Sequence, residues 1–154
     1  MNNKSQKTFY PLIVIFILIL VSFVAQNIFR LVSYPIFFSY TRNIFSLLIV
    51  ILELVFLIQG IRLMFTTTKE KGKLKLFLML TGVSAIILLP SAILHNLFYG
   101  FATVSENFEY LFKALHVVFF IVGIVVTPVT FIVGVIGSII LFKSKRYRKG
   151  ISAE

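Results

Sequence analysis

Four long runs of apolar residues, separated by short polar segments, dominate the chain and predict its fold. The runs cover residues 10–29, 44–64, 74–99 and 114–142. Each has the roughly 20 residues that a helix needs to cross the hydrocarbon core of a membrane. The runs are continuous rather than alternating, which favours helices over barrel strands. We therefore expect an all-α fold: a single membrane domain over residues 1–154, with four transmembrane helices in up-down-up-down order and a basic tail over residues 143–154.

The composition supports a membrane protein over a water-soluble one. Hydrophobic residues make up 59% of the chain and charged residues 13%, and the mean hydropathy is +1.03. Soluble domains are about 45–50% apolar and about 25% charged, so lipid must cover the excess apolar surface. The chain has no cysteine, which excludes disulfides and thiolate metal sites.

The positions of the basic residues predict the orientation. Twelve of the 15 Lys and Arg fall in the N-terminal segment, the link between the second and third runs, and the tail. The other three are Arg30, Arg42 and Lys113. Basic residues concentrate on the cytoplasmic side of membrane proteins, so we expect both ends in the cytoplasm and a multi-pass location in the cytoplasmic membrane. The net charge of +10 is thus a topology signal, and we expect no nucleic-acid partner.

The segments between the runs predict three turns. The short link at residues 66–72 makes the second and third helices antiparallel neighbours. Residues 31–43 are aromatic rather than polar and are expected to form a loop in the headgroup layer. Alternatively, Pro35 starts the second helix early. Residues 101–112 form a second outer loop.

Each run carries a stripe of small or polar residues at helical spacing, which predicts its inward face. In the second run the stripe consists of Ser46, Glu53 and Gly60, and in the third run of Thr81, Ser84, Ala85, Ser91 and His95. In the fourth run the packing candidates are Gly123, Gly134, Gly137 and Ser138. We interpret the stripes as the inside of a compact four-helix bundle, although small residues are common in any span and part of the pattern can be chance. Pro90 and Pro128 fall inside runs and are expected to kink their helices.

Glu53 is the candidate for an ion or proton site. It lies nine residues from both Ile44 and Arg62, near the middle of the membrane. A charged residue there costs about 2.5–3.5 kcal/mol on insertion scales, which makes it a functional candidate. Thr127 and Thr130 are its expected neighbours. The alternative is a hydrogen-bonded structural acid that fixes the register of the helices.

His95 and His116 are expected near the outer ends of the third and fourth helices. With Glu106 and Glu109 they could form a divalent-metal or pH-sensing cluster, and a haem held between the two histidines is a weaker alternative. The simpler interpretation is a pair of interfacial histidines that hydrogen-bond locally. Arg30 and Arg42 could contact lipid phosphate, pair with these acids, or extend to the interface.

The tail carries a cluster of basic residues directly after the fourth span. Its members are Lys143, Lys145, Arg146, Arg148 and Lys149. Such a cluster can contact anionic lipids at the cytoplasmic face, and it is also the ordinary stop signal after a span.

No arrangement of nucleophile, base or phosphate-binding loop is present, so we expect no enzyme and no cofactor. The sequence favours a small accessory, regulatory or protective membrane subunit that works through a membrane-protein partner or as a homo-oligomer. The alternative is a proton- or cation-coupled transporter or channel that uses Glu53. Outward-facing metal or haem binding through His95 and His116 is a third hypothesis.

Overall fold

In the computed structural model every element is a helix. The structure describes residues 3–32, 35–105 and 107–151, with side chains for residues 5–28, 43–105 and 107–144. The elements are α1 (Asn3–Val32), α2 (Pro35–Thr67), α3 (Lys73–Val104), α4 (Glu109–Ile121), the π-helix η1 (Val122–Val126) and α5 (Thr127–Ile151). Four helical stretches are long and apolar enough to cross a membrane, with α4, η1 and α5 together forming the fourth. The expected all-α architecture with four such helices is confirmed.

The helices are longer than the apolar runs that predicted them. The expected loop over residues 31–43 is wrong, and the alternative that Pro35 starts the second helix is confirmed, because α2 begins at Pro35. A proline suits the first position of a helix, since its missing N–H would have no helical partner there. Between the third and fourth spans, α3 continues to Val104 and α4 begins at Glu109, which shortens the second expected loop.

A tight turn joins α2 to α3, as the sequence predicts. The Glu70 N–H donates to the Thr67 carbonyl at 2.9 Å, and the Lys75 N–H donates to the Gly72 carbonyl at 3.1 Å. Gly72 has a φ of 66°, a conformation that glycine adopts at little cost. The two helices therefore run antiparallel, side by side.

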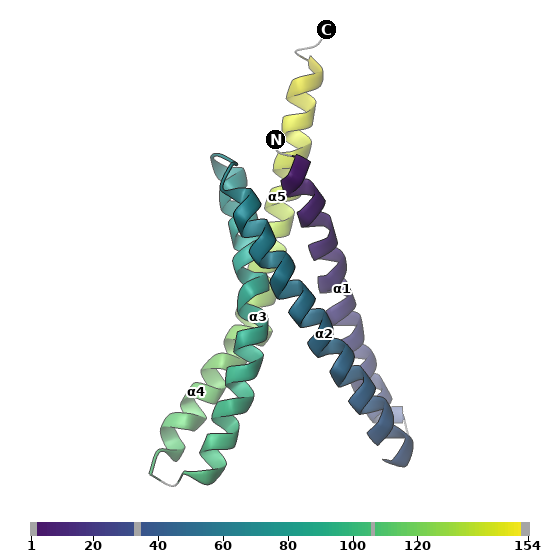
Figure 1. The fold of residues 1–154 in the computed structure, drawn as a ribbon, viewed down its shortest axis with the longest axis vertical. Helices are drawn as coiled ribbons and strands as arrows, with labels where there is room; N and C mark the ends of the chain where they lie inside the picture. Colours follow the sequence, from purple (N-terminus) through teal and green to yellow (C-terminus); the bar gives the residue numbers. More distant parts are fainter. Residues whose placement is uncertain (1–2, 33–34, 106, 152–154) are drawn as a thin grey trace.

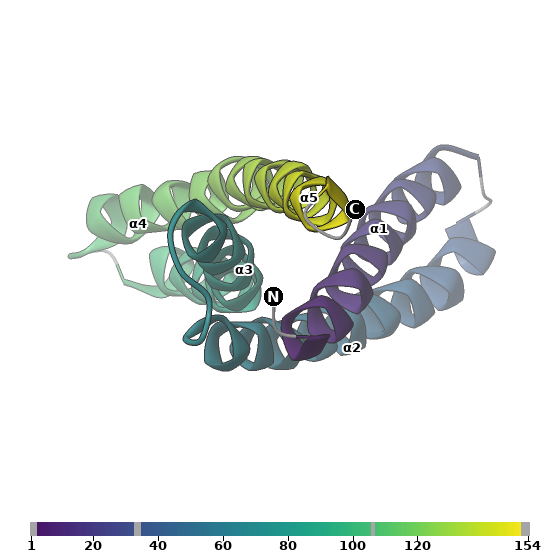
Figure 2. The same cartoon turned by 90° about the horizontal axis from the view of Figure 1, so that it is seen from above.

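The helices form two arms rather than a compact bundle. Figure 1 shows α1 with α2 in one arm and α3 with α4 in the other, meeting near the two termini and separating toward the opposite end. The view from above in Figure 2 shows the same separation. The expected compact packing of all four helices therefore holds only at one end.

Aromatic side chains fill the region where the arms meet. Phe16 of α1 lies 4.3 Å from Phe131 of α5 and 5.9 Å from Phe56 of α2, measured between ring centroids. Nearer the termini, Phe9 and Phe142 pack edge to face at 5.4 Å. All five side chains are buried, so this cluster is the main contact between α1 and α5.

The π-helix lies immediately before Pro128. Its last hydrogen bond runs from the Thr127 N–H to the Val122 carbonyl, five residues back. Pro128 has no N–H and its ring clashes with the carbonyl four residues earlier, so a wider turn relieves the clash. Figure 1 shows α4 and α5 running in different directions on either side of η1. By contrast, α3 continues as α-helix through Pro90, and a kink there stays a prediction.

Candidate functional site

A groove of about 380 Å³ lies between the two arms. Its walls come from α1 and α2 on one side and from α3, α4, η1 and the start of α5 on the other. Most of the lining is aliphatic or aromatic, with Phe16, Phe23, Leu88 and Phe120 among the larger side chains. The polar lining residues are Gln26, Ser46, Glu53, His95 and Asn96. The separation of the arms thus creates an apolar surface with a small polar set.

Glu53 faces this groove from α2. Its side chain is half-buried, and among the described residues no hydrogen bond or ion pair to it is found. Ile124 and Pro128 line the same groove, so Glu53 shares it with the irregular part of the fourth span. The expected neighbours Thr127 and Thr130 do not line it, and the candidate ion site is therefore not assembled from these three residues.

Thr130 belongs instead to the contact between α3 and α5. The Thr130 hydroxyl lies 2.7 Å from that of Ser84 and also bonds to backbone carbonyls of its own helix. Thr127 is buried. Hydroxyls that satisfy one another between helices are typical of packing faces in membranes.

Small residues allow α5 and η1 to approach α3 closely. A Cβ on Gly134 would lie 2.5 Å from the Thr81 hydroxyl, and one on Gly137 would overlap atoms of the Phe77 ring. A Cβ on Gly123 would lie 3.3 Å from the Ser91 Cβ. Ser138 is fully buried, and its hydroxyl has no hydrogen-bond partner among the described residues. The three glycines among the packing candidates of the fourth run thus face α3, and the fourth candidate, Ser138, is buried.

A second close contact joins α2 to α3. A Cβ on Gly60 would lie 2.8 Å from the Ala85 Cβ and 2.9 Å from the Gly82 carbonyl oxygen. Sequence reasoning missed Gly82, because it lies one residue beside the stripe that was followed along the third run. Gly82 is itself a small residue, and this was the available signal in the sequence for its contact with Gly60.

His95 and His116 form a reciprocal pair between α3 and α4. His95 Nδ1 lies 3.1 Å from the His116 carbonyl oxygen, and His116 Nδ1 lies 3.0 Å from the His95 carbonyl oxygen. The rings stack with centroids 3.9 Å apart and planes at 22°. A carbonyl oxygen only accepts hydrogen bonds, so Nδ1 of each ring carries the hydrogen and, in the neutral ring, Nε2 is left as an acceptor.

This stacking argues against the metal and haem hypotheses, which were the alternatives to a pair of hydrogen-bonded histidines. A metal ion lies in the plane of each imidazole that ligates it, and two nearly parallel rings this close have no shared point near both Nε2 atoms. No group of three or more potential ligand side chains occurs among the described residues. Glu106 lies outside the described residues. Glu109 forms an ion pair with Lys113 at 2.5 Å, within the first turn of α4, where an acidic residue also favours the helix dipole.

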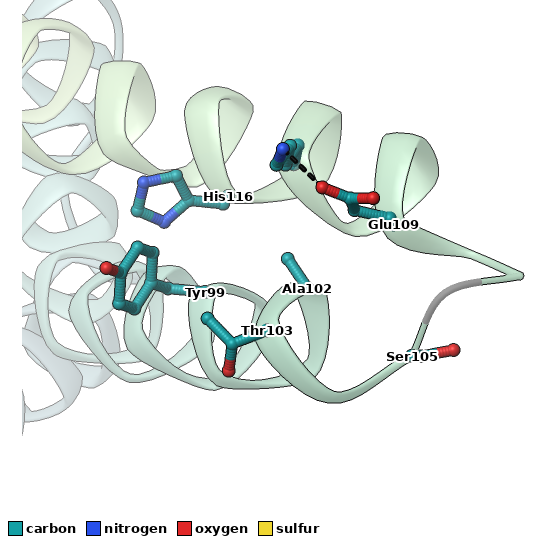
Figure 3. Close-up of a pocket in the computed structure, with 7 residues that line it drawn as sticks. Tyr99, Ala102, Thr103, Ser105, Glu109 and His116 are labelled. Carbon is teal, nitrogen blue, oxygen red and sulfur yellow. Dashed lines mark hydrogen bonds and ion pairs between the residues drawn. The ribbon is translucent and has the colours of Figure 1, made fainter.

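A second cavity of about 520 Å³ lies beside the histidine pair at the end of this arm. Its lining includes Tyr99, Thr103, Glu109, Lys113 and His116. Figure 3 shows Glu109 on α4 with a dashed line that marks its ion pair, and Tyr99 below His116. The charged groups on the wall of this cavity thus already pair with each other.

The basic tail continues α5 as a helix to Ile151. The Lys143 side chain is exposed. The side chains of Lys145, Arg146, Arg148 and Lys149 lie outside the described residues, as do those of Arg30 and Arg42. Lipid contact by these residues stays a prediction.

The chain matches no protein-family model, no curated protein and no solved structure.

Proposed function

We propose that this protein is a multi-pass accessory subunit of the cytoplasmic membrane that holds a transmembrane helix of a partner protein in the groove between its arms. Both termini lie in the cytoplasm, as the distribution of basic residues favours. The tail adds contacts to anionic lipid headgroups on that side. The protein acts through binding and catalyses no reaction.

The observation that carries the proposal is the groove with Glu53 on its wall. Only 11% of the residues in the most apolar part of α2 are buried within the chain. The other residues of this part stay at least partly accessible from outside. In lipid, helices associate through close packing and polar contacts rather than through the hydrophobic effect. The apolar walls of the groove offer close packing. The carboxyl of Glu53, for which no partner is described, offers a polar contact.

The volume of the groove also suits a helix face. About 380 Å³ accommodates a few side chains rather than a whole helix, whose diameter is about 10–12 Å. A partner helix would therefore lie along the opening between the arms and insert one row of side chains. This is the helix-in-groove mode of recognition, placed inside a membrane.

Introduced cysteines test this proposal directly, because the chain has none of its own. Val50 of α2 lines the groove and Leu48 does not, while both side chains are exposed, at 54% and 41%. Crosslinking in native membranes from Val50→Cys should give one protein adduct that maps to a transmembrane segment, and Leu48→Cys should not give it. Equal adducts from both positions, or lipid adducts alone, would contradict a helix-binding groove.

A second candidate function is proton- or cation-coupled transport, which the free carboxyl of Glu53 favours. Against it, Thr127 and Thr130 are engaged in helix packing. The groove also separates two arms instead of leading through a closed bundle. Transport would require further subunits around the groove, and a flux measurement decides between the two functions.

A further inference from the structure

We infer that the groove selects a partner helix that carries a hydrogen-bond donor, a basic or amide side chain, at the depth of Glu53. The inference depends on the proposed helix-binding function and adds the chemistry of the partner. It starts from Glu53, which has a carboxyl group on an apolar wall. An acceptor on an apolar wall is unfavourable without a hydrogen-bond partner, so a ligand that supplies a donor there is favoured.

The other polar residues of the groove already have partners. The Gln26 amide donates to the Ser46 hydroxyl at 3.0 Å, which joins α1 to α2. The Asn96 amide donates to the Ala92 carbonyl at 2.9 Å. Nδ1 of His95 donates to the His116 carbonyl, and in the neutral ring Nε2 only accepts. Among the polar lining residues, Glu53 is the one for which no hydrogen bond is described at all, so we assign the polar recognition of a ligand to its carboxyl group.

A second copy of this chain would not supply the donor. Glu53 lies nine residues from both Ile44 and Arg62, or about 14 Å of helix from each. The basic residues of the chain are near the ends of the spans, while the middle of the other spans offers Ser, Thr and Gly. Of those hydroxyls, the ones of Ser84 and Thr130 pair across the contact between α3 and α5, and those of Thr127 and Ser138 are buried within the chain. The donor therefore comes from a different polypeptide.

A lipid chain would not supply it either. The middle of a bilayer contains hydrocarbon, which has no hydrogen-bond donor. A lipid in the groove could cover Leu88 and Phe120 but would leave Glu53 unsatisfied. A helix with Lys, Arg, Asn or Gln at its centre covers the same apolar walls and also contacts the carboxyl.

Synthetic transmembrane peptides test the inference without a known partner. The probes are leucine–alanine helices with a central Lys, Asn or Leu, added to liposomes that contain the full chain. Binding is measured as energy transfer between a fluorophore on Lys71→Cys, in the turn far from the groove, and a label on the peptide. A central donor lies at the same depth in either orientation of the peptide. A mixture of the two orientations in the liposomes therefore does not change the comparison of affinities.

We expect the Lys and Asn peptides to bind about 3- to 20-fold more tightly than the Leu peptide, the range of polar contacts between membrane helices. Moving the donor by seven residues, about 10 Å along the helix, should remove the preference. The Glu53→Leu variant should bind all peptides equally. The Glu53→Gln variant, which keeps the shape of the side chain, should lose most of the preference for Lys and retain some for Asn.

The outcomes separate the inference from the function on which it depends. If all peptides crosslink to Val50→Cys and not to Leu48→Cys, with equal affinity, the groove binds helices and the role of Glu53 is overturned. If no peptide crosslinks at Val50→Cys, the helix-binding function itself fails. Crosslinks between two copies of the chain at Val50→Cys would replace the foreign helix with a second copy and would also overturn the inference.

Discussion

At the scale of single residues, the histidine pair is the most specific contact in the described part of the chain. Each ring crosses from its own helix to donate to the backbone of the other, at 3.1 Å and 3.0 Å. The rings of Tyr99 and Phe120 lie against the pair, at 5.2 Å from His116 and 5.3 Å from His95. The two Nδ1–H donors thereby have acceptors in an apolar setting. They also join the end of α3 to α4, next to the turn between these helices.

The reciprocal bonds predict that the two histidines are energetically coupled. His95→Phe and His116→Phe keep an aromatic ring but remove the donor, so each should cost about 1–3 kcal/mol of stability. Loss of one donor shifts both rings, so the double variant should cost less than the two single variants together, by at least about 0.5 kcal/mol. Unfolding in detergent micelles measures this cycle.

A nearby asparagine provides the control for this cycle. The Asn96 amide bonds only within its own helix, to Ala92, and Asn96→Leu should change stability by no more than about 0.5 kcal/mol. Strictly additive costs for the two histidine variants would mean that the rings act independently, contrary to the reciprocal geometry.

At the scale of elements, the contact between α3 and α5 depends on the absence of a side chain at Gly134. A Cβ there would meet the Thr81 hydroxyl at 2.5 Å and two backbone atoms below 3 Å. Backbone atoms cannot rotate away, so Gly134→Ala should force the helices apart and cost about 1–3 kcal/mol. Gly100, also within a helix, has nothing within 4 Å of the position that a Cβ would take, and Gly100→Ala should be neutral or stabilising by up to about 1 kcal/mol. Unfolding in detergent measures both variants, and equal effects at the two positions would refute close packing at Gly134.

The sequence predicted the elements better than their contacts. Long apolar runs predict spanning helices because lipid leaves the backbone no other way to satisfy its hydrogen bonds. Helix ends were less predictable, since aromatic residues such as Tyr99 and Phe101 neither break a helix nor mark its end. The stripe of Ser46, Glu53 and Gly60 illustrates the remaining limit. Its three members meet α1, the groove and α3 respectively, and a one-dimensional pattern cannot assign each residue to a different neighbour.

At the scale of the whole molecule, the open arrangement explains why the candidate site differs from the expected one. Side chains at the same depth, such as Glu53 and Thr130, could share a site only if all four helices packed closely along their length. The aromatic cluster around Phe16, Phe56 and Phe131 holds the arms together at one end only. Beyond it the arms separate, and Glu53 faces the groove.

The open shape also predicts the result of a flux experiment. Liposomes with the wild-type protein, the only protein present, should conduct protons and cations no faster than empty liposomes, because two separated arms do not enclose a continuous polar path. Glu53→Gln should behave in the same way and unfold at a similar temperature. Flux in the wild type that disappears in Glu53→Gln would establish the carboxyl as a coupling or gating group, and transport would replace helix binding as the function. Flux that is equal in both would indicate conduction that does not use Glu53, and the groove would then need another explanation.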